Sequence, residues 1–167
     1  MTVRLARYSL TLGLALVLLI LGGCAQPRAI PAQEGAIRNT WTGRLALRVQ
    51  SDPAQSFSAG FDLRGDAQAG ELSLFSPLGS TIAQLVWSPA GARLRWDGKE
   101  ENFDSLDALT RRATGTELPI SSMFHWLNGD QTKVDGWQAD LGDLSRRRLV
   151  ARRSTPAPEV EMRLVFD

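Results

Sequence analysis

The sequence has a single cysteine, Cys24, and a single histidine, His125, among its 167 residues. One cysteine allows no intramolecular disulfide, so the fold must rest on buried apolar side chains. One histidine without a second cysteine leaves no pattern typical of zinc ligands, and the acidic residues are scattered. There is no glycine-rich phosphate loop, and the serines closest to His125 stand in the same short segment. We therefore expect no metal, no cofactor and no enzymatic activity.

A strong net charge is also missing. The 19 basic and 18 acidic side chains nearly cancel and leave a formal charge of +1. Removal of residues 1–23 would take away Arg4 and Arg7 and no acid, so the charge would fall to −1. A balance of this kind gives no indication of nucleic-acid binding, which typically needs a strongly basic surface.

An apolar run occupies residues 10–23 and ends at Cys24. Arg4 and Arg7 precede it, as in the charged region of a secretory signal. The run is shorter than the roughly 20 apolar residues of a membrane-spanning helix. Its last residues with the cysteine, Leu-Gly-Gly-Cys, resemble the bacterial lipobox, in which the cysteine is lipidated and becomes the mature N-terminus. We expect a lipoprotein signal peptide at 1–23; a chance cysteine beside an ordinary cleavage site is the alternative.

The segment after the cysteine has neither a helical nor a strand pattern. Residues 24–38 contain Pro27 and Pro31 among small and polar residues, and we interpret them as a lipidated N-terminus with a flexible tether. Ala25 stands where an aspartate would resemble the inner-membrane retention signal of many lipoproteins. We therefore expect anchoring through Cys24 at the periplasmic face of the outer membrane.

From residue 41 onward, apolar and polar residues alternate with the period of two that is typical of β-strands. Turns rich in proline and glycine separate the runs, and such short connections predict antiparallel neighbours in a meander. We expect roughly nine strands, of which the last three cover 137–141, 146–153 and 160–166. A long antiparallel sheet of this kind curls, which predicts an unclosed barrel.

Residues 104–129 interrupt the strand pattern. Asp104 is expected to cap a short helix that ends at Gly115, and Pro119 to open a second helix with Phe124 and Leu127 on its apolar face. The pattern therefore predicts a mainly β fold class: an antiparallel unclosed β-barrel, or half-barrel, with an apolar interior and short helices that can plug its concave side.

Two further segments stand out. Pro77, Leu78 and Gly79 form a tight link between strands, with an apolar residue at its tip that could dip into a bilayer. The arginine-rich stretch 146–153 is interpreted as a solvated strand face with Leu149 and Ala151 turned inward. Electrostatic docking to an acidic partner or to anionic headgroups is the alternative for these arginines.

Three stretches together resemble one family. They are Trp-Thr-Gly-Arg-Leu-Ala-Leu-Arg-Val at 41–49, Ser-Pro-Leu-Gly-Ser-Thr at 76–81, and Gly-Thr-Glu-Leu-Pro-Ile-Ser-Ser-Met-Phe-His-Trp-Leu-Asn-Gly at 115–129. Their residues and their order, after a lipobox and a tether, resemble the outer-membrane lipoprotein receptor LolB family over about 41–166. The expected domain is thus 39–167, although the chain is shorter than typical members around its last strands.

The resemblance implies a function and its partners. Members accept lipoproteins from the periplasmic carrier LolA and insert them into the outer membrane, with no nucleotide or metal. The implied partners are a LolA-like carrier, lipoprotein acyl chains and outer-membrane phospholipid, with the protein acting as a monomer. Leu78 would correspond to the loop leucine that assists membrane insertion, and Cys24 to the anchor. The resemblance further implies that the short helices cover an apolar cavity in the half-barrel. Alternation then assigns these acyl-binding residues to it: Leu45, Leu47, Phe61, Leu63, Leu72, Leu74, Leu94, Trp96, Phe124, Leu127 and Met162.

A rival hypothesis belongs to another class of protein. The same pattern of strands would suit a structural envelope lipoprotein whose packed barrel acts in the assembly of another complex. The two hypotheses differ in whether the interior of the barrel is open to an apolar ligand.

Overall fold

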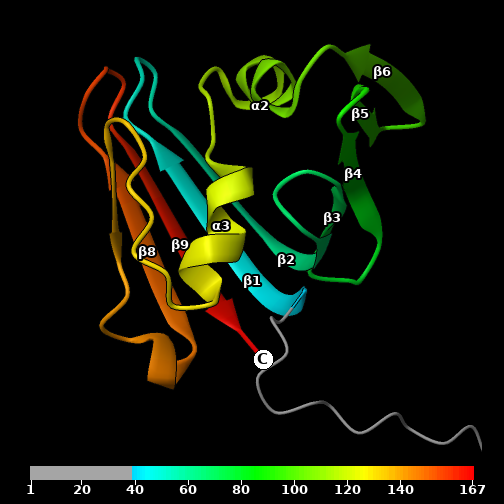
Figure 1. Ribbon diagram of the computed structural model, residues 1–167. Helices are drawn as coiled ribbons and strands as arrows, with labels where there is room; N and C mark the ends of the chain where they lie inside the picture. The colour runs from blue at the N-terminus through cyan, green and yellow to red at the C-terminus, as the bar shows by residue number, and fades with distance from the viewer. Residues whose placement is uncertain (1–38) are drawn as a thin grey trace, which may run out of the picture. The chain divides into compact units, whose positions relative to one another are not determined.

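The computed structural model of the chain describes residues 39–167 (Figure 1). The signal peptide, the lipidated Cys24 and the tether predicted for residues 1–38 lie outside the described residues. The strands are β1 (Thr40–Val49), β2 (Gln55–Gly65), β3 (Gly70–Phe75), β4 (Thr81–Ser88), β5 (Gly91–Trp96), β6 (Lys99–Phe103), β7 (Trp137–Asp140), β8 (Arg148–Arg153) and β9 (Val160–Phe166). Two helices, α2 (Leu106–Thr114) and α3 (Ile120–Leu127), and a short 3₁₀ turn, η1 (Leu144–Arg146), complete the elements.

All nine strands belong to one antiparallel sheet with the order β6-β5-β4-β3-β2-β1-β9-β8-β7. Strands β1 to β6 form a meander, and β9 pairs with β1 so that the last three strands extend the sheet on the other side. The two outermost strands, β6 and β7, are not paired with each other, so the sheet curls without closing. These findings confirm the predicted fold class, including the helical insertion before the last three strands.

The register shows which connections share an end of the sheet. Val49, at the end of β1, lies opposite Gln55 of β2, and Phe75, at the end of β3, lies opposite Gly60 of the same strand. The β1–β2 turn and the β3–β4 loop, residues 76–80, therefore leave the sheet at the same end. We call this end of the sheet the loop end.

Both helices are short and have identifiable boundaries. α2 begins after Ser105, whose side-chain oxygen accepts a hydrogen bond from the backbone N–H of Ala108, and it ends at Gly115 in a left-handed conformation with φ of 73°. The prediction that Asp104 caps this helix is wrong by one residue, because the hydroxyl of Ser105 reaches the free N–H. α3 begins after Pro119, as expected.

The core lies between the helices and the concave face of the sheet (Figure 1). In β1 and β9 the inward-facing residues are almost fully buried while their neighbours are exposed, as the alternation predicts. Within residues 39–167 the buried cluster extends from Trp41 to Phe166, and residues 37–167 form one compact unit, so this unit has a core of its own. No helix within residues 39–167 is long and apolar enough to cross a membrane.

The strand predicted at 146–153 begins two residues later than expected. Residues 144–146 form η1, and Arg147 then adopts a left-handed conformation with φ of 59° before β8 starts. A residue in this conformation cannot continue a strand, so the chain turns here and enters the sheet at Arg148. Leu149 and Ala151 do point inward and are fully buried.

Candidate functional site: an apolar cavity and an exposed loop leucine

A cavity of about 520 Å³ lies between the concave face of the sheet and the helical segment. Its volume is within the roughly 300–1,000 Å³ that is usual for small-ligand sites. The lining is predominantly aliphatic and aromatic, and it is contributed by β1 to β6, β9, the second half of α2, the link between the helices and the start of α3. An interior that is enclosed by apolar side chains yet unfilled suits an apolar ligand, since it offers few hydrogen-bonding groups to a polar one.

Seven of the eleven residues predicted for the cavity line it. They are Leu45, Leu47, Leu72, Leu74, Leu94, Trp96 and Met162. The other four do not line this cavity and are buried in the neighbouring core: Phe61, Leu63, Phe124 and Leu127. Alternation along a strand determines which face a side chain occupies, but not where along that face the helices pack.

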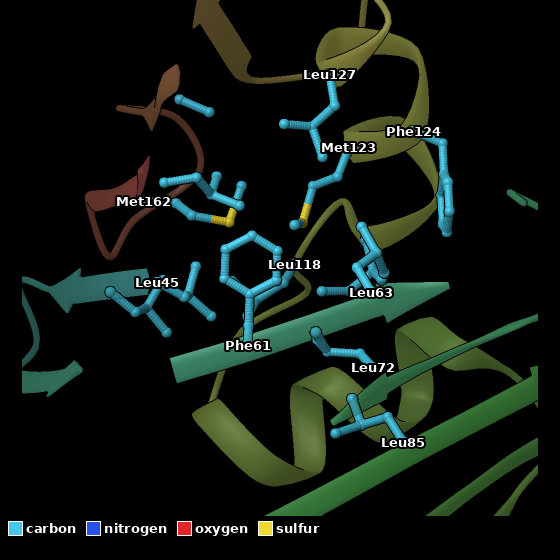
Figure 2. Close-up of a cluster of buried hydrophobic side chains, with 14 of the residues drawn as sticks. Leu45, Phe61, Leu63, Leu72, Leu85, Leu118, Met123, Phe124, Leu127 and Met162 are labelled. Atoms are coloured by element: carbon cyan, nitrogen blue, oxygen red, sulfur yellow. The ribbon is translucent and has the colours of Figure 1, made fainter. Parts of the chain in front are cut away.

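The four core residues mark the place where α3 fills the concave side. Phe124 packs edge-on against Trp41 and Trp87, with ring centroids 5.5 Å and 6.0 Å apart. Figure 2 shows Met123 of α3 directed toward the sheet, above Phe61. α3 therefore closes one part of the half-barrel with solid packing, and the cavity occupies the remainder beside it.

The lining residues differ greatly in exposure, and the difference locates the mouth of the cavity. Met162 and Ile120 are 1% and 2% exposed, whereas Phe57, Ile82 and Trp96 are 40%, 37% and 39% exposed. The last three, which we call the mouth residues, lie near the loop end of β2, β4 and β5. Phe57 and Ile82 were not among the predicted cavity residues, although a large apolar residue beside a turn is a signal that could have indicated them.

Polar groups are few and gather near the mouth. The Trp96 indole N–H donates to a Glu101 carboxylate oxygen at 3.3 Å, and Arg112 lies 3.9 Å from the same carboxylate group. Deeper in the lining, Thr110 is 1% exposed and its hydroxyl accepts a hydrogen bond from the backbone N–H of Leu118. This bond fixes the segment between the two helices above the cavity.

The loop 76–80 holds Leu78 clear of the protein surface. Its side chain is 94% exposed, the highest value among the exposed large hydrophobic residues of the structure's described part. The Gly79 N–H donates to the Ser76 carbonyl at 2.9 Å, and the Ser76 N–H donates to the Ser80 carbonyl at 2.9 Å. Pro77 occupies the second position of this turn, which its fixed φ favours, and Gly79 has a φ of +83° that other residues rarely adopt. The turn is thus closed by its own hydrogen bonds, with Leu78 at its tip.

Arg153 does not belong to a solvated face, contrary to the interpretation of the arginine-rich stretch. It is 7% exposed and follows Leu149 and Ala151 on the inward-facing side of β8. Its guanidinium donates to the Thr116 hydroxyl and to the Pro158 carbonyl, and lies 5.7 Å from the centre of the Trp137 ring. Burial lowers its pKa from the ordinary arginine value. Its hydrogen bonds tie β8 to the α2–α3 segment.

His125 lies on the outer side of α3, with about half of its side chain exposed. Its Nδ1 is 3.8 Å from an Asp130 carboxylate oxygen, and it does not line the cavity. The residue thus flanks the amphipathic helix, as expected from its position in the sequence.

The open sheet, the covering helices and the apolar cavity define a class: half-barrel proteins with an apolar internal cavity. Within that class, the chain belongs to the outer membrane lipoprotein LolB family, whose model matches residues 39–156. This result confirms the family resemblance noted in the sequence.

Individual relatives agree with the family match. Outer-membrane lipoprotein LolB of Bordetella petrii is 30% identical over an alignment of 173 positions, which covers 89% of this chain and 87% of that protein. The protein of the same name from Chromobacterium violaceum is 35% identical over 116 residues, or 66% of this chain and 63% of that protein. The protein of this name from Azoarcus sp. is 27% identical over an alignment of 172 positions, which covers 89% of this chain and 88% of that protein. These names support an outer-membrane location.

Proposed function

We propose that this protein receives lipoproteins from a LolA-like periplasmic carrier, holds their acyl chains in the cavity, and inserts them into the outer membrane. The observation that carries the proposal is the apolar cavity of about 520 Å³, together with its mouth at the end of the sheet that carries Leu78. Membership of the outer membrane lipoprotein LolB family supports it.

The physical need for such a receptor follows from the cargo. Each methylene group of an acyl chain costs about 0.8 kcal/mol when it is exposed to water. A chain that moves from one apolar cavity to another, and then to the bilayer, avoids most of this cost. Transfer proceeds without nucleotide if each site binds the chain more tightly than the one before it, because the differences in binding free energy then supply the direction.

Cys24 and Leu78 have separate roles in this proposal. Lipidated Cys24 keeps the domain near the membrane that receives the cargo, which raises the frequency of productive encounters. Leu78 enters the bilayer and opens a path for the acyl chain. Anchoring should therefore improve efficiency, whereas the transfer itself depends on the loop and the cavity.

The proposal is tested with residues 39–167, which contain the complete core and carry no anchor. We expect this domain to bind a fluorescent fatty acid, to release it to an unlabelled competitor, and to take up a lipoprotein from loaded carrier. Absence of both fatty-acid binding and lipoprotein uptake would contradict the proposal and favour a structural lipoprotein. His125→Ala serves as a control that should leave both activities intact, whereas a lipid-processing enzyme that uses this histidine would lose activity.

A further inference from the structure

Five arginines lie together on the face of the sheet opposite the cavity. On β1, Leu45 and Leu47 line the cavity, so the alternating Arg44 and Arg48 point to the other side. The same alternation applies to β9 and β8, which lie beside β1 in the sheet (Figure 1). We name this set the outer-face arginine cluster: Arg44, Arg48, Arg148, Arg152 and Arg163.

The register arranges the cluster in three rows across β1, β9 and β8. The row nearest the loop end contains Arg48, Glu161 and Arg152. The next row places Arg163 between two small aliphatic side chains. The third row contains Arg44, Val165 and Arg148. Val165 lies in the middle of this row and is 51% exposed.

The cluster has far more positive than negative charge. Glu161 pairs with Arg163 at 2.7 Å and with Arg152 at 2.8 Å, and these two arginines hold its pKa below the usual range. Arg44, Arg48 and Arg148 form no salt bridge with any carboxylate in residues 39–167. The strands on either side of the cluster add little negative charge. The residues of β2 that lie opposite this part of β1 are Ser56, Ser58 and Gly60, which are uncharged. On the other side, β7 adds the single acidic residue Asp140.

This excess is not a general property of the sheet's outer face. On β5, Arg93 and Arg95 are held by Glu100 at 3.5 Å and 3.0 Å, and on β2 Arg64 pairs with Asp62. Like charges on neighbouring strands oppose folding. A concentrated excess at one place, beside compensated arginines elsewhere, indicates an anionic surface as the partner.

The position of the cluster favours the bilayer as that surface. Arg48 is the second-last residue of β1, so the first row lies toward the loop end, where Leu78 and the mouth residues are also found. Both described helices pack against the concave face and leave the cluster open. Guanidinium groups match phosphate oxygens well, and a basic patch is one of the signals that strengthen membrane attachment by an apolar group.

We propose that the outer-face arginine cluster binds anionic phospholipid headgroups, and so sets the orientation in which the protein meets the membrane. With the cluster on the headgroups and Leu78 in the apolar layer, the mouth of the cavity faces the bilayer surface. The inference rests on the proposed membrane role of the protein but does not require acyl binding.

The test measures partition of residues 39–167 onto vesicles. One set contains phosphatidylcholine with phosphatidylglycerol, and the other contains phosphatidylcholine alone. The double variant Arg44→Gln/Arg48→Gln removes two unpaired charges from β1. The control, Arg93→Gln/Arg95→Gln, removes the same charge from β5, where Glu100 already compensates it. Each arginine near an anionic surface contributes roughly a fivefold factor, so the β1 variant should bind anionic vesicles about 30-fold more weakly.

The outcomes separate this inference from the proposed function. We expect the vesicle binding of the β5 control to decrease much less than that of the β1 variant. The difference between the two variants should disappear at high salt or on neutral vesicles. Equal partition of the β1 variant and the control would overturn the inference. It would also be overturned if the β1 variant kept its vesicle binding but lost association with the loaded carrier, since the cluster would then serve an acidic protein. Absence of both fatty-acid binding and lipoprotein uptake in the wild-type domain would contradict the proposed function and would not affect this inference.

Discussion

Leu78 allows the proposed insertion step to be perturbed without disturbing the fold. Its side chain is 94% exposed, so replacement should change the free energy of unfolding by no more than about 0.5 kcal/mol. Leu78→Ala removes three carbon atoms, and each buried one contributes about 0.8 kcal/mol to membrane insertion. The loss of about 2.4 kcal/mol corresponds to a roughly 50-fold weaker engagement of the bilayer. Leu78→Glu should be more severe, because it adds a charge that resists transfer from water.

The assay follows a lipoprotein that carries a fluorescent acyl group as it passes from loaded carrier to receptor and then to liposomes. Both Leu78 variants should accept the cargo at the wild-type rate and release it to liposomes slowly. Urea unfolding measured in parallel should give wild-type stability. The two steps are therefore separated within one experiment.

A matched control is available at the other end of the sheet. Ala90 lies in the exposed β4–β5 turn, away from the loop end, so Ala90→Glu introduces the same charge without touching the proposed insertion loop. Wild-type release by Leu78→Glu, or equal impairment by Ala90→Glu, would refute the role assigned to the loop.

Three further predictions concern the cavity, its cover and a surface turn. Ala83→Phe places a ring in the cavity and should weaken fatty-acid binding at least tenfold. Displacing two methylene groups of the fatty acid from the cavity loses about 1.6 kcal/mol of binding free energy. Ala46→Phe, on the outer face of the sheet, is the control. Thr110→Val leaves the Leu118 N–H unpaired and should lower the unfolding free energy, measured by urea unfolding, by about 1–3 kcal/mol. Thr110→Ser keeps the hydroxyl and should retain most of the wild-type stability. Hydrogen bonds from the backbone N–H groups of Ala69 and Gln68 lower the pKa of Asp66 in the folded state. The stabilisation that these bonds provide is therefore present above the ordinary pKa of 3.8 and is lost as the pH falls through the folded-state pKa. In Asp66→Asn, the unfolding free energy should decrease less steeply as the pH is lowered.

The sequence predicted the sheet well because alternation reports a local property. Val160, Met162, Leu164 and Phe166 recur with a period of two, and β9 has the predicted bounds. The helix ends were also predictable from Gly115 and Pro119, whose backbone preferences are intrinsic. Family resemblance then supplied the lid and the cavity, which no local pattern could indicate.

The boundary between cavity and core was not predictable in the same way. Leu63 and Leu72 both follow the alternation of their strands, yet Leu72 lines the cavity and Leu63 lies in the solid core. The difference depends on where α3 crosses the sheet, which is a long-range property. Arg153 illustrates a different limit. Its position in the alternation is inward, but its charge favoured the opposite assignment. Its hydrogen bonds to the Thr116 hydroxyl and the Pro158 carbonyl, which no local pattern indicates, compensate its burial.

The order of strands has a mechanical consequence. β6 and β7 are the two outermost strands of the sheet, and they are also the strands that precede and follow the helical segment. The chain therefore leaves one edge and returns at the opposite one, so residues 104–136 act as a clasp across the seam of the half-barrel. Because α2 and α3 of this segment pack into the core, separating the edges would break that packing as well as pull on the connection. The exposed mouth residues lie at the loop end, so under the proposed function an acyl chain should enter and leave there rather than between the edges.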